Sequence, residues 1–210
     1  FRATFGLGEA PFVLALPGSR RSEVARLAPV FGEALALFCK NHPEHRVVVP
    51  AAGPVAGAVK EALRDWPEGA VLIDPSEFEV ESAKAHKRAA FAGADLALAA
   101  SGTVSLELAA AATPMVIAYR FQWLTWQIMK RMALIDTVTL VNLVSETRVV
   151  PECLGPECTA ENIAARLDQV LSAPDAQQDA MRLTMDRVGE GGDAPGLRAA
   201  RAVLERLPQV

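Results

Sequence analysis

Short apolar runs alternate with helical patterns along most of this chain, and this alternation constrains the fold more than any other feature. Apolar runs predict strands at 11–17, 46–51, 70–74, 95–100, 114–119 and 137–143. Apolar residues at helical spacing predict helices at 22–41, 54–66, 81–92, 103–112, 121–133 and 159–172. Continuous apolar strands joined by helices indicate a parallel sheet buried on both faces. The sequence therefore predicts an α/β fold with a doubly wound parallel sheet, of the Rossmann-like kind.

The chain divides unevenly. Residues 1–172 are expected to form the sheet domain, whereas 173–195, with PDAQQD and GEGGDAP, are punctuated like a linker. Residues 196–207 read as a final helix that packs on the same or a neighbouring domain. The chain opens on Phe1 rather than methionine and its first predicted strand begins at 11. We therefore expect that an amino-terminal domain of a larger protein is missing.

Composition excludes several classes of protein. A net charge of −4 and a pI near 5.5 argue against nucleic-acid binding, which normally needs a basic surface. The cysteines, Cys39, Cys153 and Cys158, show no CxxC spacing, so no disulfide framework or cysteine zinc site is expected, and a reducing, cytoplasmic setting fits best. The sequence shows neither an apolar run of about 18 residues nor a signal-peptide pattern.

Two strand-to-helix loops have the chemistry of a phosphate site. Gly18-Ser19-Arg20 follows the first strand and offers a close backbone approach, a hydroxyl and a permanent cation. Ser101-Gly102-Thr103 follows the 95–100 strand and offers hydroxyls at the positive end of a helix. Both are also ordinary turn and cap sequences, but their shared place at the junctions of one sheet favours the phosphate site. Neither matches the GxGxxG or GxxxxGK[ST] pattern, which disfavours a standard dinucleotide or Walker site.

Glu107 lies further along the helix that follows Gly102. A carboxylate there would accept hydrogen bonds from a pair of sugar hydroxyls or remain a solvated surface group, and its position leaves both readings open.

Several segments together resemble a known family. "LALPGSRRSEV", "ALAASGTVSLELAAAATPMVIAYR", "VTLVNLV" and "VVPECLGPECTAENIA" resemble, in that order, the carboxyl-terminal half of the lipid-A-disaccharide synthase family, which are inverting glycosyltransferases of the glycosyltransferase-B type. The resemblance implies transfer of diacylglucosamine from UDP to lipid X, with UDP released. It also implies that the carboxyl-terminal domain binds the nucleotide, whereas the amino-terminal domain holds the acceptor site and the catalytic base.

The family's motifs imply roles for individual residues. Arg20 is expected to contact the diphosphate, Ser101-Gly102-Thr103 to border it, and Glu107 to lie at the sugar or ribose. Asn142 matches a polar position after a late strand, and Glu152 resembles a glutamate near the nucleotide.

One departure from the family pattern is visible. A glutamine usually follows that proline-glutamate pair where this chain has Gly155, which puts the contact from this loop in doubt.

The chemistry agrees with the resemblance on independent grounds. A departing UDP gains negative charge on its diphosphate, which a fixed cation and a helix N-terminus stabilise. The chain has no Asp-x-Asp pair, so we expect a mechanism without metal or cofactor. The acceptor hydroxyl needs a general base. His42 and His45 read as solvent-facing loop residues and His86 as part of a polar helix face, so this chain alone is expected to bind nucleotide without turnover.

The stretch 121–135 joins Trp123 and Trp126 to Lys130 and Arg131. Tryptophans beside cations suit a membrane interface, and acylated substrates imply peripheral contact with the cytoplasmic face of a bacterial inner membrane. A crossover helix buried against the sheet or a partner domain is the alternative, because the stretch is apolar nearly all round.

Other functions stay open at this point. The alternatives are another UDP-sugar enzyme of the same fold, such as the peptidoglycan N-acetylglucosaminyltransferase or a UDP-N-acetylglucosamine epimerase, and a non-catalytic nucleotide-binding module. The detached final helix is compatible with a homodimer, although nothing in the sequence requires one.

Overall fold

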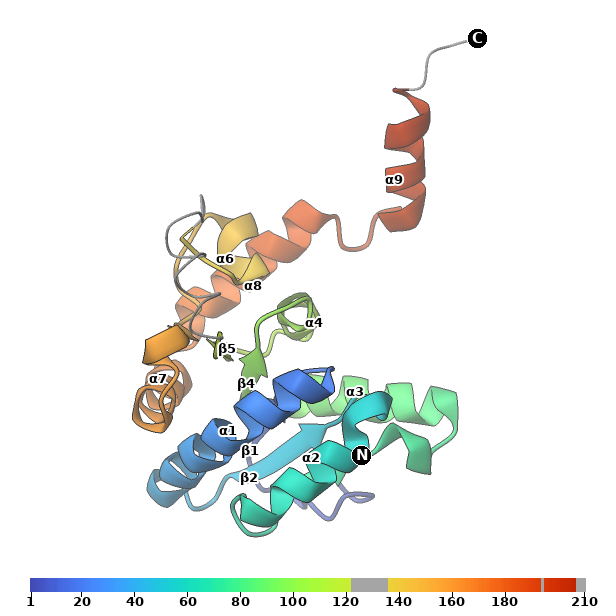
Figure 1. Ribbon diagram of the computed structural model, residues 1–210. Helices are drawn as coiled ribbons and strands as arrows, with labels where there is room; N and C mark the ends of the chain where they lie inside the picture. The colour runs from blue at the N-terminus through green and yellow to red at the C-terminus, as the bar shows by residue number, and fades with distance from the viewer. Residues whose placement is uncertain (122–135, 194, 207–210) are drawn as a thin grey trace.

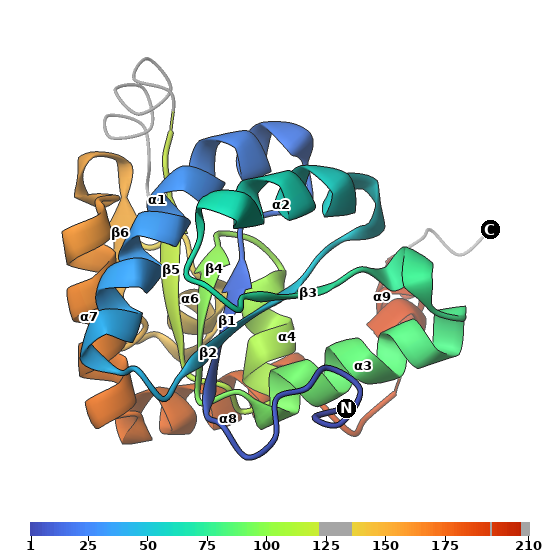
Figure 2. The ribbon, with the colours of Figure 1, turned by 90° about the horizontal axis from the view of Figure 1, so that it is seen from below.

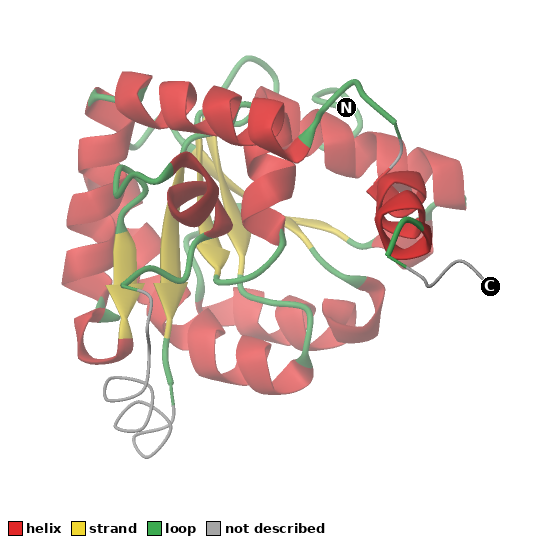
Figure 3. Cartoon of the chain, turned by 90° about the horizontal axis from the view of Figure 1, so that it is seen from above, coloured by secondary structure: helices red, strands yellow, loops and turns green. Residues whose placement is uncertain are grey.

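The computed structural model describes residues 1–121, 136–193 and 195–206. A six-stranded, fully parallel sheet has the order β3-β2-β1-β4-β5-β6. Its strands are β1 (Phe12–Leu16), β2 (Arg46–Pro50), β3 (Val71–Ile73), β4 (Leu96–Ala100), β5 (Met115–Tyr119) and β6 (Glu152–Leu154). Figure 3 shows the strands in the middle of the molecule with helices on either side. The predicted α/β fold with a doubly wound sheet is confirmed.

Helices cover both faces of the sheet (Figure 2). One face carries α1 (Arg21–Asn41), α2 (Ala56–Ala62) and α7 (Ala160–Ser172). The other carries α3 (Val80–Gly93), α4 (Val104–Ala110), α6 (Leu140–Ser145) and α8 (Asp175–Val188). Short 3-10 turns occur at η1 (Gly53–Val55), η2 (Leu63–Asp65), η3 (Pro75–Glu77) and η4 (Gly155–Glu157).

The two faces are built from alternate residues of the same strands. In β1, Val13 and Ala15 belong to the core between the sheet and α1. Phe12 and Leu14 belong to the core between the sheet and α3 and α4. Every residue of β1 and β4 is buried, which explains why these strands read as continuous apolar runs.

The strand predicted at 137–143 is wrong. Leu140–Ser145 forms α6, and the sixth strand is β6, further along the chain. The amides of Val138 and Thr139 donate to the Glu152 carboxylate instead of to a neighbouring strand. A side-chain carboxylate thus accepts the backbone hydrogen bonds that a neighbouring strand would accept if this β-branched segment joined the sheet.

The prediction of a linker over 173–195 is wrong for most of that range, because Asp175–Val188 forms α8. Gln177 on this helix is buried, and its side chain exchanges hydrogen bonds with the backbone of Met115 at 2.9 and 3.1 Å. These contacts dock α8 on the start of β5. The final helix, α9 (Pro195–Leu204), stands apart from the sheet in Figure 1.

The apolar helix predicted at 121–133 lies almost wholly outside the described residues, so its two readings stay predictions. Within residues 1–121, 136–193 and 195–206, no helix combines the length and the hydropathy needed to cross a membrane.

The cysteines are free thiols. Cys153 and Cys158 are buried, and burial raises the pKa of Cys153 to about 11.

Candidate functional site

The strand order places a site between β1 and β4. The chain runs outward from β1 through β2 to β3, and outward from β4 through β5 to β6, so the order reverses between the two central strands. Ligands of doubly wound sheets bind beyond the carboxyl ends of the strands at such a point. A pocket of about 680 Å³ lies there, lined by residues after β1 and after β4. The predicted residues that line it are Gly18, Ser19, Arg20, Ser101, Gly102, Thr103 and Glu107.

The first loop is organised around Glu23, a residue in the first turn of α1 that was not predicted as part of the site. The Glu23 carboxylate accepts from the backbone amides of Ser19 at 3.0 Å and Arg20 at 3.3 Å. The Arg20 guanidinium donates to the same carboxylate at 2.8 Å. The loop therefore binds an anion already, and that anion is a side chain of the protein itself.

Gly18 makes this arrangement sterically feasible. Its φ is +118°, in the region that favours glycine. A Cβ at this position would lie 2.6 Å from the Glu23 Cβ and 2.7 Å from its Oε2. A side chain at 18 would therefore push the carboxylate away from the amides.

The second loop enters α4. The Ser101 hydroxyl donates to the Val138 carbonyl at 3.3 Å, and the Ser105 hydroxyl donates to the Gly102 carbonyl at 2.9 Å. Thr103 is the N-cap residue of α4, without a side-chain capping bond. Nothing lies within 4 Å of a Cβ placed at Gly102, so the backbone there faces open space in the pocket.

Glu107 is paired rather than free. Its Oε2 lies 2.6 Å from the Nζ of Lys87 on α3, which also lines the pocket, and both side chains are about half-exposed. Lys84, one turn earlier on α3, also lines the pocket. Neither lysine was predicted, because no motif in the sequence marks α3 as part of the pocket. The signal available in the sequence was that Lys84 and Lys87 lie one turn apart on a predicted helix.

The structure does not bring Asn142 and Glu152 into this pocket. They line a second pocket of about 450 Å³ together with Arg148 and Arg166. Asn142 is 1% exposed, and its amide group donates to the Val150 carbonyl at 2.9 Å and accepts from the Val150 amide at 3.0 Å. Its side chain thereby attaches α6 to the segment that leads into β6.

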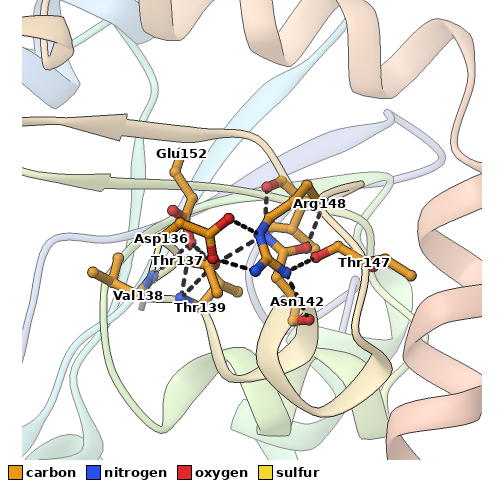
Figure 4. Close-up of polar contacts among 9 residues, drawn as sticks. Asp136, Thr137, Val138, Thr139, Asn142, Thr147, Arg148 and Glu152 are labelled. Carbon is orange, nitrogen blue, oxygen red and sulfur yellow. Dashed lines mark hydrogen bonds and ion pairs between the residues drawn. The ribbon is translucent and has the colours of Figure 1, made fainter. Parts of the chain in front are cut away.

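Glu152 is occupied in a similar way (Figure 4). One carboxylate oxygen accepts from the Thr137 hydroxyl at 2.6 Å and from the backbone amides of Val138 at 3.0 Å and Thr139 at 2.8 Å. Val138 in turn accepts from Ser101. Glu152 is thus linked to the Ser101 loop through the backbone of Val138, and its predicted contact with a nucleotide stays a prediction.

An ion pair closes the outside of this cluster. The Arg148 guanidinium hydrogen-bonds the Asp136 carboxylate and the carbonyl of Thr147 (Figure 4). The hydrogen bond from Arg148 lowers the pKa of Asp136 below its usual value. Both side chains are exposed, so this pair adds little to stability.

The fold and the pocket invite comparison with known proteins. A family model described as Lipid-A-disaccharide synthetase matches residues 4–195. The chain belongs to this family. It is 66% identical over 207 residues to the lipid-A-disaccharide synthase of Ruegeria pomeroyi, covering 99% of this chain and 52% of that protein. For the Rhodospirillum centenum enzyme of the same name, the identity is 39% over 208 residues, covering 97% and 50%. The chain thus spans about half the length of these curated family relatives.

Solved structures outside the family agree on the fold. A UDP-GlcNAc 2-epimerase from Neisseria meningitidis, bound to UDP-GlcNAc, superposes with a TM-score of 0.61 at 14% identity, covering 98% of this chain and 48% of that one. The calicheamicin glycosyltransferase CalG4 gives 0.58 at 19% identity, covering 96% and 44%. These likenesses show the glycosyltransferase-B type of fold and nothing about the substrate.

Proposed function

We propose that this chain is the nucleotide-sugar-binding half of an inverting glycosyltransferase that moves diacylglucosamine from UDP to lipid X, forming the lipid A disaccharide. The observation that carries the proposal is the convergence of the Gly18 and Gly102 loops on one pocket where the strand order reverses. The family match and the curated relatives support this transferase over other UDP-sugar enzymes. They also argue against a non-catalytic module.

The pocket's charges suit a diphosphate leaving group. Arg20 approaches from the β1 side, while Lys84 and Lys87 approach from α3. As the sugar–phosphate bond breaks, these cations stabilise the charge that develops on the diphosphate, and the glycine-containing loops allow a close backbone approach. Glu107, which lines the same pocket beside Lys87, would accept hydrogen bonds from the sugar or ribose hydroxyls.

The remaining parts of the reaction are assigned to an amino-terminal domain. That domain would supply the acceptor site for lipid X and the general base. The final helix offers it a surface, because Leu197, Val203 and Leu204 on α9 are exposed. Since both substrates are acylated, the enzyme would work at the cytoplasmic face of the bacterial inner membrane as a peripheral protein.

Calorimetry with UDP on the chain itself tests the nucleotide assignment. We expect saturable heat and a thermal shift, and an absence of both at millimolar UDP contradicts the proposal. Comparing acylated with free UDP-N-acetylglucosamine separates the transferase from the epimerase and the peptidoglycan enzyme, since only the first is expected to prefer the acylated donor.

Arg20→Ala tests the diphosphate contact. Losing a charge-assisted hydrogen bond should lower the affinity for UDP about tenfold or more. The affinity for uridine, which lacks phosphate, should change little. Arg21→Ala is the matched control, because Arg21 is an exposed neighbour that does not line the pocket. Equal losses for UDP and uridine would remove Arg20 from the diphosphate.

A further inference from the structure

The turn between α1 and β2 gathers metal-ligating side chains far from the nucleotide pocket. His42, Glu44 and His45 each offer a ligand atom, and these atoms lie within 4.8 Å of one another. Glu44 Oε1 lies 3.8 Å from His42 Nδ1 and 3.1 Å from His45 Nδ1. The prediction that both histidines face solvent is wrong for His45, whose side chain is 6% exposed.

Each imidazole turns its other nitrogen toward a carboxylate from a different part of the fold. His42 Nε2 lies 2.9 Å from Asp168 Oδ1 on α7. His45 Nε2 lies 4.0 Å from Asp95 Oδ2, just before β4, and within the described part of the chain this buried nitrogen has no hydrogen-bond partner. His42 thus has the arrangement usual for a metal-bound histidine, in which the outer N–H donates to a carboxylate that orients the ring and strengthens the ligand.

Phe38 holds the rings in place. It is fully buried, its ring stacks on His42 at a centroid distance of 4.6 Å, and it meets His45 edge-on at 5.4 Å. Two ligands anchored by a core residue need little reordering to bind an ion, so less conformational entropy opposes binding.

We propose that His42, Glu44 and His45 form a binding site for Zn²⁺ or a similar divalent transition metal. Two imidazole nitrogens and one carboxylate oxygen match the borderline-soft preference of Zn²⁺, and three protein ligands leave a fourth position for water. Tetrahedral ligands at Zn–N and Zn–O distances near 2.1 Å lie about 3.4 Å apart. The two distances from Glu44, 3.1 and 3.8 Å, bracket that separation, and the ligand atoms of the two imidazoles lie within 4.8 Å of each other, so side-chain rotations can bring the three ligands together.

The site lies at the start of β2, whereas the nucleotide pocket lies beyond the carboxyl ends of the strands. A metal here therefore takes no part in the proposed transfer. It ties the end of α1 to β2 and, through Asp168, to α7. The expected consequence is higher thermal stability in the metal-bound protein.

Titration of the untagged, chelator-treated chain with ZnCl₂ tests the proposal. We expect one equivalent to bind, with micromolar or tighter affinity and a raised melting temperature, and Co²⁺ to give the visible absorption of a tetrahedral ion. His42→Ala should abolish this binding. His86→Ala is the matched control, because His86 lies among aromatic rings on α3 and should leave the titration unchanged.

A second variant separates a built site from loose surface binding. Asp168→Asn keeps the shape of the side chain but removes the charge that supports His42. The affinity for Zn²⁺ should therefore fall about tenfold or more. A wild-type protein without saturable heat, or a His42→Ala variant that titrates like the wild type, overturns the proposal. Unchanged affinity in Asp168→Asn also counts against it.

Discussion

The pocket loops and the Asn142–Glu152 cluster contain similar residue types, but their polar groups differ in exposure to solvent. In the pocket, the Arg20 cation stays accessible: its side chain is 78% exposed, although it is paired with the Glu23 carboxylate in the first turn of α1. In the cluster, Asn142 is 1% exposed and both ends of its amide group are bonded to the Val150 backbone. Both regions were predicted from sequence as ligand contacts.

The difference teaches how a polar group that is free to take a ligand differs from one whose hydrogen bonds are already made within the fold. A buried amide whose bonds are all made stabilises the fold, because each partner would otherwise lose its hydrogen bond away from water. The guanidinium of Arg20 is exposed, although its partner, the Glu23 carboxylate, is only 13% exposed, so a ligand can reach the cation from solvent. Accessibility of the donor, rather than residue type, separates the two regions.

The largest effect is expected for Asn142→Ala. Truncation leaves the amide and carbonyl of Val150 without partners in a buried setting, which should lower the free energy of unfolding by about 3 kcal/mol. Urea denaturation measures this loss, and Asn162→Ala, at an exposed position near the start of α7, should lose less than about 1 kcal/mol. A normally stable Asn142→Ala protein that fails to bind UDP would place Asn142 back among the ligand contacts.

A smaller effect is expected for Lys87→Met. The variant removes a cation from the pocket and leaves the Glu107 carboxylate unpaired, so UDP should bind about fivefold more weakly, equivalent to about 1 kcal/mol. Isothermal titration with UDP measures the change. Arg88→Met, next along α3 at an exposed position outside the pocket lining, is the control, and equal changes in both variants would point to a general charge effect.

The smallest effect is expected for Glu23→Gln, and its direction is a gain. Glutamine keeps an acceptor for the Ser19 and Arg20 amides but gives up the negative charge that holds the Arg20 guanidinium. UDP should bind about threefold more tightly at low salt, and the gain should shrink as salt screens the charge. Glu33→Gln, exposed on the same helix, should show no gain. Weaker UDP binding in Glu23→Gln would mean that the charge of Glu23 supports the site instead of competing for it.

Most strands and helices were predictable because local pattern and tertiary environment agree. The buried strands β1 and β4 are apolar throughout, and helical spacing located α1 and α7. Prediction failed where side chains satisfy the backbone. The 137–143 segment reads as a strand, but Glu152 binds its amides and α6 follows. Residues 173–195 have the composition of a linker, so α8 was not predicted. This helix is held on the sheet by the hydrogen bonds of Gln177 with the backbone of Met115.

By itself, the sequence determined the fold class, the family and the two glycine-containing loops, because these depend on periodicity and on motifs that are contiguous in the chain. Only the tertiary structure decided which polar residues share a pocket. Lys87 meets Glu107, and Asp168 meets His42, across separations in sequence that no local pattern records. The physical reason is that a binding site depends on distance and on access to water, and the packing of the helices on the sheet sets both.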